Sequence, residues 1–193
     1  MMKLVVYIHG FNSSPLSFKA NILSNLIQKM ASTADFHCPS LSHWPEQAVK
    51  SLSDKIGDYS VDDITLIGSS LGGFYATYLS DYFGYRSVLI NPAITPQEGL
   101  RSYMGPQKNL YTNEDYDFTL EHLRQLKSFY VPKPRNPERL FLIHTTGDEL
   151  LDWKIAARHY EGAKRLIISG GDHGFSNFED YAQIALSFVE SGA

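Results

Sequence analysis

The sequence predicts an α/β protein in which a mainly parallel sheet of about six strands is covered by helices on both faces. Two observations lead to this prediction. Six short, mainly apolar runs alternate along the chain with segments whose apolar residues recur at helical spacing. Each run also leads into a loop rich in Gly, Pro, Asn, Asp or Ser. Alternation of this kind favours parallel strands joined through helices.

The strands are predicted from their composition. The first run, Leu4–Ile8, is rich in β-branched and aromatic residues, and Ile64–Gly68 suits a strand that is covered on both faces. Prolines stop the second and fourth runs. The six predicted strands are Leu4–Ile8, Asp35–Cys38, Ile64–Gly68, Ser87–Ile90, Leu140–His144 and Arg165–Ile168.

The helices are predicted from stripes of apolar residues. Ile22, Leu23, Leu26 and Ile27 lie on one face of the first helix, and Gly84 is expected to end the third at its C-cap. The predicted helices run approximately over Phe18–Met30, Glu46–Ile56, Leu71–Phe83, Phe118–Phe129, Asp152–Tyr160 and Phe178–Val189.

One segment interrupts the alternation. Ile94–Glu138 is too long for a plain connection and is rich in Tyr and Phe. It is inserted between the fourth and fifth predicted strands, where it would form either a cap over the carboxyl ends of the strands or a surface elaboration. Because the chain contains no repeat, low-complexity tract or linker, we expect a single domain, residues 1–193, with a cap insertion at about residues 94–138.

Composition excludes several classes of protein. The 193 residues suffice for one substantial core, and a formal net charge of −4 without basic clusters argues against nucleic-acid binding. The single cysteine, Cys38, excludes an internal disulfide, fits a reducing compartment and is expected to be a small buried side chain. The apolar run after Met1-Met2-Lys3 is too short for a signal peptide or a membrane span, so we expect a soluble, cytoplasmic protein.

The stretch Gly68-Ser69-Ser70-Leu71-Gly72 is the clearest functional motif. It has the G-x-S-x-G spacing of a nucleophile elbow, in which a serine sits on a sharp turn between a strand and a helix. Glycines two residues before and two residues after the serine relieve the collisions that such a turn creates. No Lys-Ser/Thr pair follows these glycines as it does in a P-loop, and no G-x-G-x-x-G is present, so a phosphate site is disfavoured. Ser70, rather than Ser69, is the expected nucleophile.

A serine nucleophile needs a base and a group that orients the base. His173 lies in a glycine-rich loop directly after the sixth predicted strand, and Asp148 follows the fifth, so all three side chains belong to one end of the sheet. Asp152 is the alternative acid, although it also suits an N-cap, and Glu149 is expected to be solvated, as is Asp172.

Two backbone N–H groups are expected to form an oxyanion hole. The N–H of Leu71 directly follows the serine, and the N–H of Phe11 lies in the loop after the first strand. The histidines show no H-E-x-x-H or comparable spacing, so neither a metal nor another cofactor is expected.

These motifs together resemble the small bacterial YqiA-type esterases of the α/β-hydrolase superfamily. The resemblance rests on five stretches that span nearly the whole chain, namely 7–15, 68–77, 91–93, 146–152 and 171–175. It implies a reduced α/β-hydrolase fold and hydrolysis of short-chain acyl esters, with Ser70, Asp148 and His173 as the catalytic residues. Relatives of the YcfP type lack the nucleophile, whereas this chain has Ser70.

The resulting hypothesis is a serine carboxylesterase whose partner is a small-molecule ester and which binds neither nucleic acid nor membrane. Two other hypotheses remain open. A thioesterase or amidase of the same fold would use the same three residues, and a non-catalytic protein could bind a small molecule in the same crevice. The sequence does not specify the oligomeric state or the physiological substrate.

Overall fold

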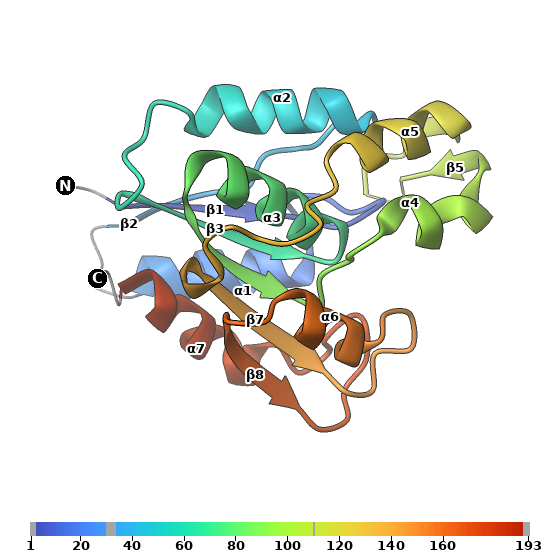
Figure 1. Cartoon of the computed structure of the whole chain (residues 1–193). Helices are drawn as coiled ribbons and strands as arrows, with labels where there is room; N and C mark the ends of the chain where they lie inside the picture. The colour runs from blue at the N-terminus through green and yellow to red at the C-terminus, as the bar shows by residue number, and fades with distance from the viewer. Residues whose placement is uncertain (1–2, 30–33, 110, 191–193) are drawn as a thin grey trace.

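The structure is a computed structural model that describes residues 3–29, 34–109 and 111–190 (Figure 1). Six strands form the main sheet in the order β2-β1-β3-β4-β7-β8, and every neighbouring pair is parallel. The strands are β1 Lys3–Ile8, β2 Ala34–His37, β3 Ile64–Ser69, β4 Arg86–Ile90, β7 Leu140–Thr145 and β8 Lys164–Ile168. The predicted α/β class with about six mainly parallel strands is confirmed.

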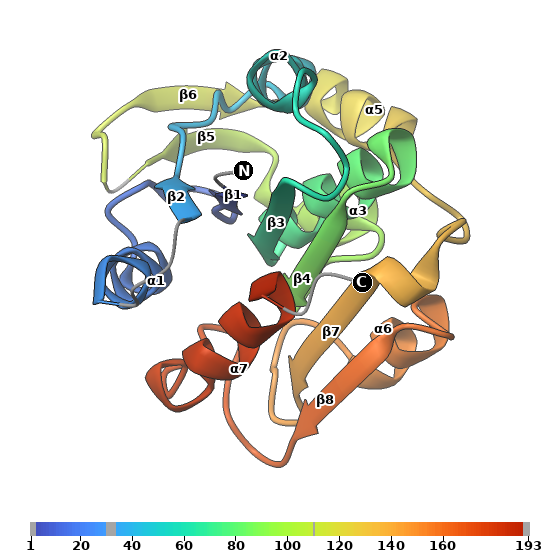
Figure 2. The same cartoon turned by 90° about the vertical axis from the view of Figure 1, so that its left-hand side faces the viewer.

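Helices cover both faces of this sheet (Figures 1 and 2). One group of three helices packs on the first face, and a pair packs on the second. The first group comprises α2 Pro45–Ile56, α3 Leu71–Phe83 and α6 Trp153–His159; the pair comprises α1 Phe18–Lys29 and α7 Glu179–Glu190. Among the described residues, no helix is both long enough and apolar enough to cross a bilayer.

The core follows from the alternation of side chains along each strand. Val6 and Leu142 belong to the apolar cluster on the α2–α3–α6 face, whereas Val5, Phe141 and Ile143 belong to the cluster beneath α1 and α7. All five side chains are almost completely buried. Both faces of the sheet are therefore buried, so a site that a ligand can reach is expected at the ends of the strands.

The insertion between β4 and β7 lies at the carboxyl end of the sheet (Figure 1). It contains short helices, a two-stranded antiparallel sheet and one longer helix that packs against α2. These elements are α4 Pro96–Gly99, η1 Leu100–Tyr103, β5 Gly105–Lys108, β6 Asp115–Phe118, α5 Leu120–Ser128 and η2 Pro137–Arg139. We refer to residues 94–138 as the cap segment.

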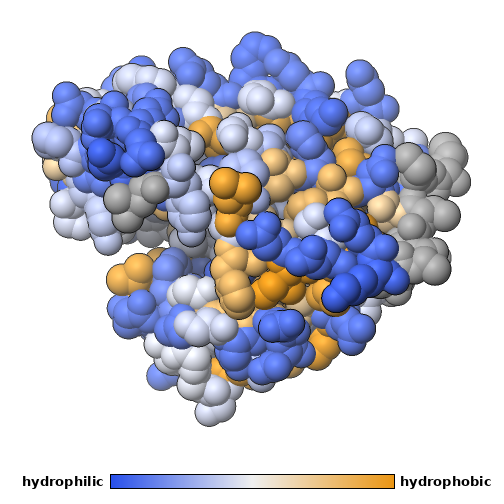
Figure 3. Space-filling view, turned by 180° about the vertical axis from the view of Figure 1, so that it is seen from behind, coloured by the Kyte–Doolittle hydropathy of each residue, from blue (hydrophilic) through white to orange (hydrophobic). Residues whose placement is uncertain are grey.

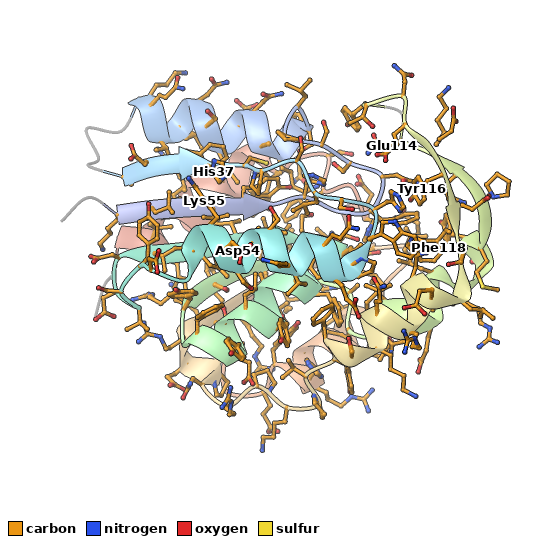
Figure 4. The ribbon with its side chains drawn as sticks, turned by 90° about the horizontal axis from the view of Figure 1, so that it is seen from above. His37, Asp54, Lys55, Glu114, Tyr116 and Phe118 are labelled. Atoms are coloured by element: carbon orange, nitrogen blue, oxygen red, sulfur yellow. The ribbon has the colours of Figure 1, made fainter. Side chains whose placement is uncertain are left out.

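The sequence prediction missed the β5–β6 hairpin and made the cap helix too long. The predicted helix Phe118–Phe129 begins only at Leu120, because Thr119 is its N-cap. Both hairpin strands are four residues long and mostly polar, so they lack an apolar run. Glu114, Tyr116 and Phe118, at every second position, turn toward the body of the protein in Figure 4.

Some predicted boundaries also shift. The part of the first predicted helix at Met30 lies outside the described residues. Cys38 follows β2 rather than belonging to it, and it is partly buried rather than fully buried; burial raises the pKa of its thiol to about 12. Large apolar residues near the start of α1, Leu16 and Phe18, are exposed. Apolar residues also gather across the middle of the rear face in Figure 3.

Candidate active site

Ser70 occupies a sharp turn between β3 and α3. Its backbone has φ 55° and ψ −119°, a conformation that a residue with a side chain adopts only under strain. A Cβ on Gly68 would collide with the backbone of Gly72, and a Cβ on Gly72 would collide with the carbonyl group of Ile8 in β1. The turn can therefore form only because both positions are glycine.

The structure brings the side chains of Ser70, His173 and Asp148 into one hydrogen-bonded chain. The distance from His173 Nε2 to Ser70 Oγ is 2.9 Å, and that from His173 Nδ1 to Asp148 Oδ2 is also 2.9 Å. A carboxylate can only accept, so Nδ1 must carry the imidazole proton and donate it. Nε2 of the neutral ring is then free to accept the Ser70 hydroxyl hydrogen.

The side chain of Asp148 is completely buried, yet it is well supplied with donors. Oδ1 accepts the N–H groups of Leu150 at 2.9 Å and Leu151 at 2.8 Å. Burial opposes ionisation, but the hydrogen bonds from His173 and from these two amides outweigh it and hold the pKa of Asp148 below its ordinary value of 3.8. Asp148 is therefore an ionised acceptor fixed in one orientation.

Asp152, the alternative acid, has a different role in the structure. It is the N-cap of α6, and its Oδ1 accepts the N–H of Lys154 at 2.8 Å. The hydrogen bond of His173 goes to Asp148 instead. The geometry therefore favours Asp148 as the group that orients the imidazole.

The two expected oxyanion donors belong to segments that adjoin Ser70. A Cβ on Gly10, the residue before Phe11, would stand 3.4 Å from the Cβ of Ser70, so the loop after β1 approaches the serine closely. Leu71 is the first residue of α3, where backbone N–H groups lack partners within the helix. Neither the Phe11 nor the Leu71 N–H has a hydrogen-bond partner among the described residues. Both residues line the pocket described next.

Ser70 and His173 open into a pocket of about 1060 Å³. The walls come from both the sheet end and the cap segment, and apolar side chains dominate them. Among the lining residues are Phe11, Ile94, Leu100, Tyr103, Leu151 and Ile155. Concave, mostly apolar pockets with a few convergent polar groups are typical of small-molecule sites.

The family model described as "Uncharacterised protein family (UPF0227)" matches residues 4–190. The chain belongs to the UPF0227 family. One relative, a UPF0227 protein of Pectobacterium atrosepticum, is 25% identical over 158 residues, which are 80% of this chain and 81% of the relative. The UPF0227 protein YcfP of Salmonella paratyphi A is 23% identical over 193 residues, which are 98% of this chain and 100% of the relative. The predicted family resemblance is confirmed.

Solved structures similar to this UPF0227 chain share its fold. Alpha/beta hydrolase domain-containing protein 10 from mouse superposes with a TM-score of 0.69 at 15% identity, covering 98% of this chain and 88% of that one. Est1E from Butyrivibrio proteoclasticus, with ferulic acid bound, superposes with a TM-score of 0.72 at 12% identity, covering 98% and 89%. These likenesses confirm the α/β-hydrolase fold.

Two further residues of this UPF0227 chain contact the histidine loop, and sequence reasoning missed both. Glu149, expected to be solvated, accepts the backbone N–H of His173 at 2.9 Å although it is exposed. Lys19 donates to the carbonyl oxygen of Gly174 and lines the pocket; burial lowers its pKa to about 8, although nearby Asp172 opposes this shift. No local pattern in the sequence marks either contact.

The remaining histidines of this family member lie outside the hydrogen-bonded chain. His144 is the last residue but one of β7 and its ring is buried, so burial lowers its pKa below 6.5. Among the described residues, no group of three or more His, Cys, Asp or Glu side chains is arranged to hold a metal ion. The expectation that no metal or cofactor is needed stays a prediction.

Proposed function

We propose that this protein is a serine carboxylesterase with Ser70 as nucleophile, His173 as general base and acid, and Asp148 as the residue that orients His173. The observation that carries the proposal is the hydrogen-bonded chain from Ser70 Oγ through His173 to the buried Asp148. Ser70 and His173, at one end of this chain, line a largely apolar pocket. This arrangement can activate a hydroxyl for acyl transfer. The esterase and hydrolase neighbours of the fold support the same reaction class.

In the proposed reaction, Ser70 Oγ attacks the ester carbonyl carbon while its proton passes to His173 Nε2. The carbonyl oxygen becomes an oxyanion, which the N–H groups of Phe11 and Leu71 stabilise; removing one such donor typically costs about 10²- to 10³-fold in rate. The carbon–oxygen bond to the alcohol then breaks, and the imidazolium gives its proton to that oxygen. Water attacks the acyl-enzyme in the same way and releases the acid and free Ser70.

The size and lining of the pocket support a proposal for the substrate class. The resemblance to YqiA-type esterases implies short acyl chains, yet a pocket of about 1060 Å³ is far larger than an acetyl group needs. Its apolar walls favour an ester in which at least one side, acyl or alcohol, is a larger apolar or aromatic group. Ferulic acid, which is bound in the structure of Est1E, is an acid with an aromatic group.

Two alternatives are compatible with the same geometry. A thioester or amide substrate would require the same three residues, so only a substrate panel distinguishes them. A protein that binds a small molecule without turnover does not require a strained serine whose hydroxyl donates to His173, nor a histidine that is oriented by an ionised Asp148. The chain of hydrogen bonds therefore favours catalysis.

A chain-length series tests the proposal. Wild type and Ser70→Ala are assayed with p-nitrophenyl esters from acetate to decanoate, with matched thioesters and anilides. We expect wild type to hydrolyse esters and Ser70→Ala to lose on the order of 10³-fold or more in kcat. Ser69→Ala, which changes the buried neighbouring serine, is the matched control and should stay active. Equal rates for wild type and Ser70→Ala would contradict the proposal.

A further inference from the structure

Asn91 is a fully buried residue that neither the triad nor the oxyanion hole uses. It directly follows β4 and begins the stretch Asn91-Pro92-Ala93, one of those that carry the family resemblance. Its backbone has a φ of 40°, in the left-handed region that asparagine tolerates better than most residues. Pro92 and Ala93 line the pocket and Asn91 does not, so a bound substrate would not touch it.

The carboxamide of Asn91 joins the loops that carry Asp148 and His173. Its Oδ1 accepts the backbone N–H of Thr145, at the end of β7, at 2.9 Å. Its Nδ2 lies 3.1 Å from the carbonyl oxygen of Asp172 and 3.2 Å from that of His173. Thr145 completes the network, because its hydroxyl lies 3.2 Å from Nδ2 and donates to the Asp172 carbonyl oxygen at 3.1 Å. A neutral amide offers one acceptor, which the Thr145 N–H uses, and two hydrogens, which the two carbonyl oxygens and the Thr145 hydroxyl share.

The residues on either side of Asn91 hold the serine turn. The N–H of Ser70 donates to the carbonyl oxygen of Ile90 at 3.0 Å, and the N–H of Ala93 donates to the carbonyl oxygen of Ser70 at 3.1 Å. Asn91 itself donates its backbone N–H to Ile143 in β7 at 3.0 Å. Residues 90–93 thus contact the backbone of the serine turn, of β7 and of the histidine loop.

The histidine loop needs such an attachment. Gly170 and Gly171 both have a φ of 76°, and the loop between β8 and α7 has no regular structure to fix it. The backbone of His173 is held at its N–H by the exposed Glu149 and at its carbonyl by the buried Asn91. Of these two hydrogen bonds, the one to Glu149 is exposed, whereas the one from Asn91 is part-buried and is therefore better protected from competition with water.

We propose that Asn91 is a positioning residue of the active site, whose carboxamide holds the backbone of His173 and Thr145 so that the imidazole lies between Ser70 and Asp148. This inference rests on the proposed function for its kinetic part. A carboxylate at this position could not donate to the two carbonyl oxygens, and an alkyl side chain could neither donate nor accept. A displacement of about 1 Å at reacting groups can cost about 10²-fold in rate.

Asn91→Asp gives the sharpest test. A protonated Asp can still donate once and accept once, whereas the ionised form faces the Asp172 and His173 carbonyl oxygens without a hydrogen. At low pH the kcat of the variant should therefore approach that of wild type measured at the same pH. At pH 8 its kcat should be about 10²-fold lower than that of wild type, with KM little changed. Wild-type activity should instead rise with pH, because the neutral imidazole is the base. Asn91→Leu should lose kcat at every pH.

Tyr85→Phe is the matched control at the other end of the same strand. Tyr85 directly precedes β4, is buried, and donates its hydroxyl to the carbonyl oxygens of Ile56 at 2.7 Å and Tyr59 at 3.2 Å. The control thus also removes buried donation to two carbonyls. We expect it to lower the thermal midpoint and leave kcat and the pH profile of wild type unchanged.

A second measurement does not depend on turnover. The proton on His173 Nδ1, identified by its absence in His173→Gln, should give a downfield NMR resonance in wild type and Tyr85→Phe. It should be lost in Asn91→Asp at pH 8 and return at low pH. If no ester is hydrolysed by wild type, the proposed function fails while this resonance still tests Asn91. The inference would be overturned if Asn91→Asp had the same kcat, pH profile and resonance as wild type. It would also be overturned if Tyr85→Phe lost as much kcat as Asn91→Asp.

Discussion

At the scale of single residues, the environment of Asp148 assigns the proton positions of the site. Its buried carboxylate accepts from two backbone amides and from His173, so it stays ionised and has one orientation. Because it only accepts, the imidazole proton must be on Nδ1 and the lone pair on Nε2, toward Ser70. Burial and hydrogen bonding thus act together. Burial removes water that would compete for the hydrogen bonds, and the three donors stabilise the negative charge of the Asp148 carboxylate.

Replacing Asp148 tests this assignment. An Asn at position 148 can present an N–H to Nδ1, which favours the wrong tautomer, and in a serine protease the equivalent change costs about 10⁴-fold in kcat. We expect a loss of that order for Asp148→Asn. Asp152→Asn is the matched control, since Asp152 caps α6 through Lys154 and should cost less than about tenfold. Steady-state kinetics on one ester compare the two, and a larger loss in Asp152→Asn would exchange their roles.

At the scale of elements, the serine turn depends on the close approach of α3 to β1. The backbone of Gly72 lies against the carbonyl group of Ile8, and that of Gly73 lies near Pro92. A methyl group on Gly72 would have to push α3 away from β1, and one on Gly73 would have to push α3 away from the turn after β4. Gly72 therefore allows the serine turn to approach the loop after β1 closely.

Gly72→Ala should be among the most destabilising single substitutions in the chain. Its Cβ would overlap the Ile8 carbonyl oxygen, so we expect a loss of about 3 kcal/mol or more in the free energy of unfolding. Gly99→Ala is the control, because a Cβ there meets nothing within 4 Å and should change stability by less than about 0.5 kcal/mol. Urea denaturation measures both, and a similar small effect at Gly72 would refute the close approach.

The cap segment is attached to the body through a pair of histidines. His122 Nδ1 accepts the N–H of Thr119, so its Nε2 carries the proton and donates to His43 Nδ1 at 3.0 Å. Trp44 stacks on His122 at 3.9 Å between ring centroids, and His43 Nε2 lies 3.9 Å from the carboxylate of Glu114 in the cap segment. Burial lowers the pKa of His122 below 6.5, and His43 lowers it further, whereas Glu121 opposes the shift.

These contacts predict that stability falls on acidification. With a lower pKa in the folded than in the unfolded state, the unfolded chain binds more protons in the window below pH 6.5. The free energy of unfolding should therefore be greatest above pH 6.5 and fall below it. His122→Asn retains an acceptor near Thr119 but cannot titrate, so its stability should fall less between pH 8 and 5.5. Urea unfolding at both values decides, and an equal fall in both proteins would contradict this role.

At the scale of the whole molecule, the positions of the three candidate residues could be predicted from sequence because they depend on the ends of parallel strands. Ser70, Asp148 and His173 each follow a strand that composition reveals, and parallel strands bring such positions to one edge. The attachments of His173 could not be predicted, since Glu149 lies 24 residues away in sequence and Asn91 lies 82 away. The β5–β6 hairpin was not predicted for a related reason. Its strands are four residues long and mostly polar, and their side chains contact the rest of the protein instead of forming an apolar run in the sequence.

Covalent labelling of Ser70 tests the central claim most directly. A fluorophosphonate probe is incubated with wild type, Ser70→Ala and Ser69→Ala, and the modified peptide is located by mass spectrometry. The account predicts one phosphonyl group, on Ser70, in wild type and Ser69→Ala, and no labelling of Ser70→Ala. Labelling that persists in Ser70→Ala, or a wild-type protein that the probe does not modify, would contradict it.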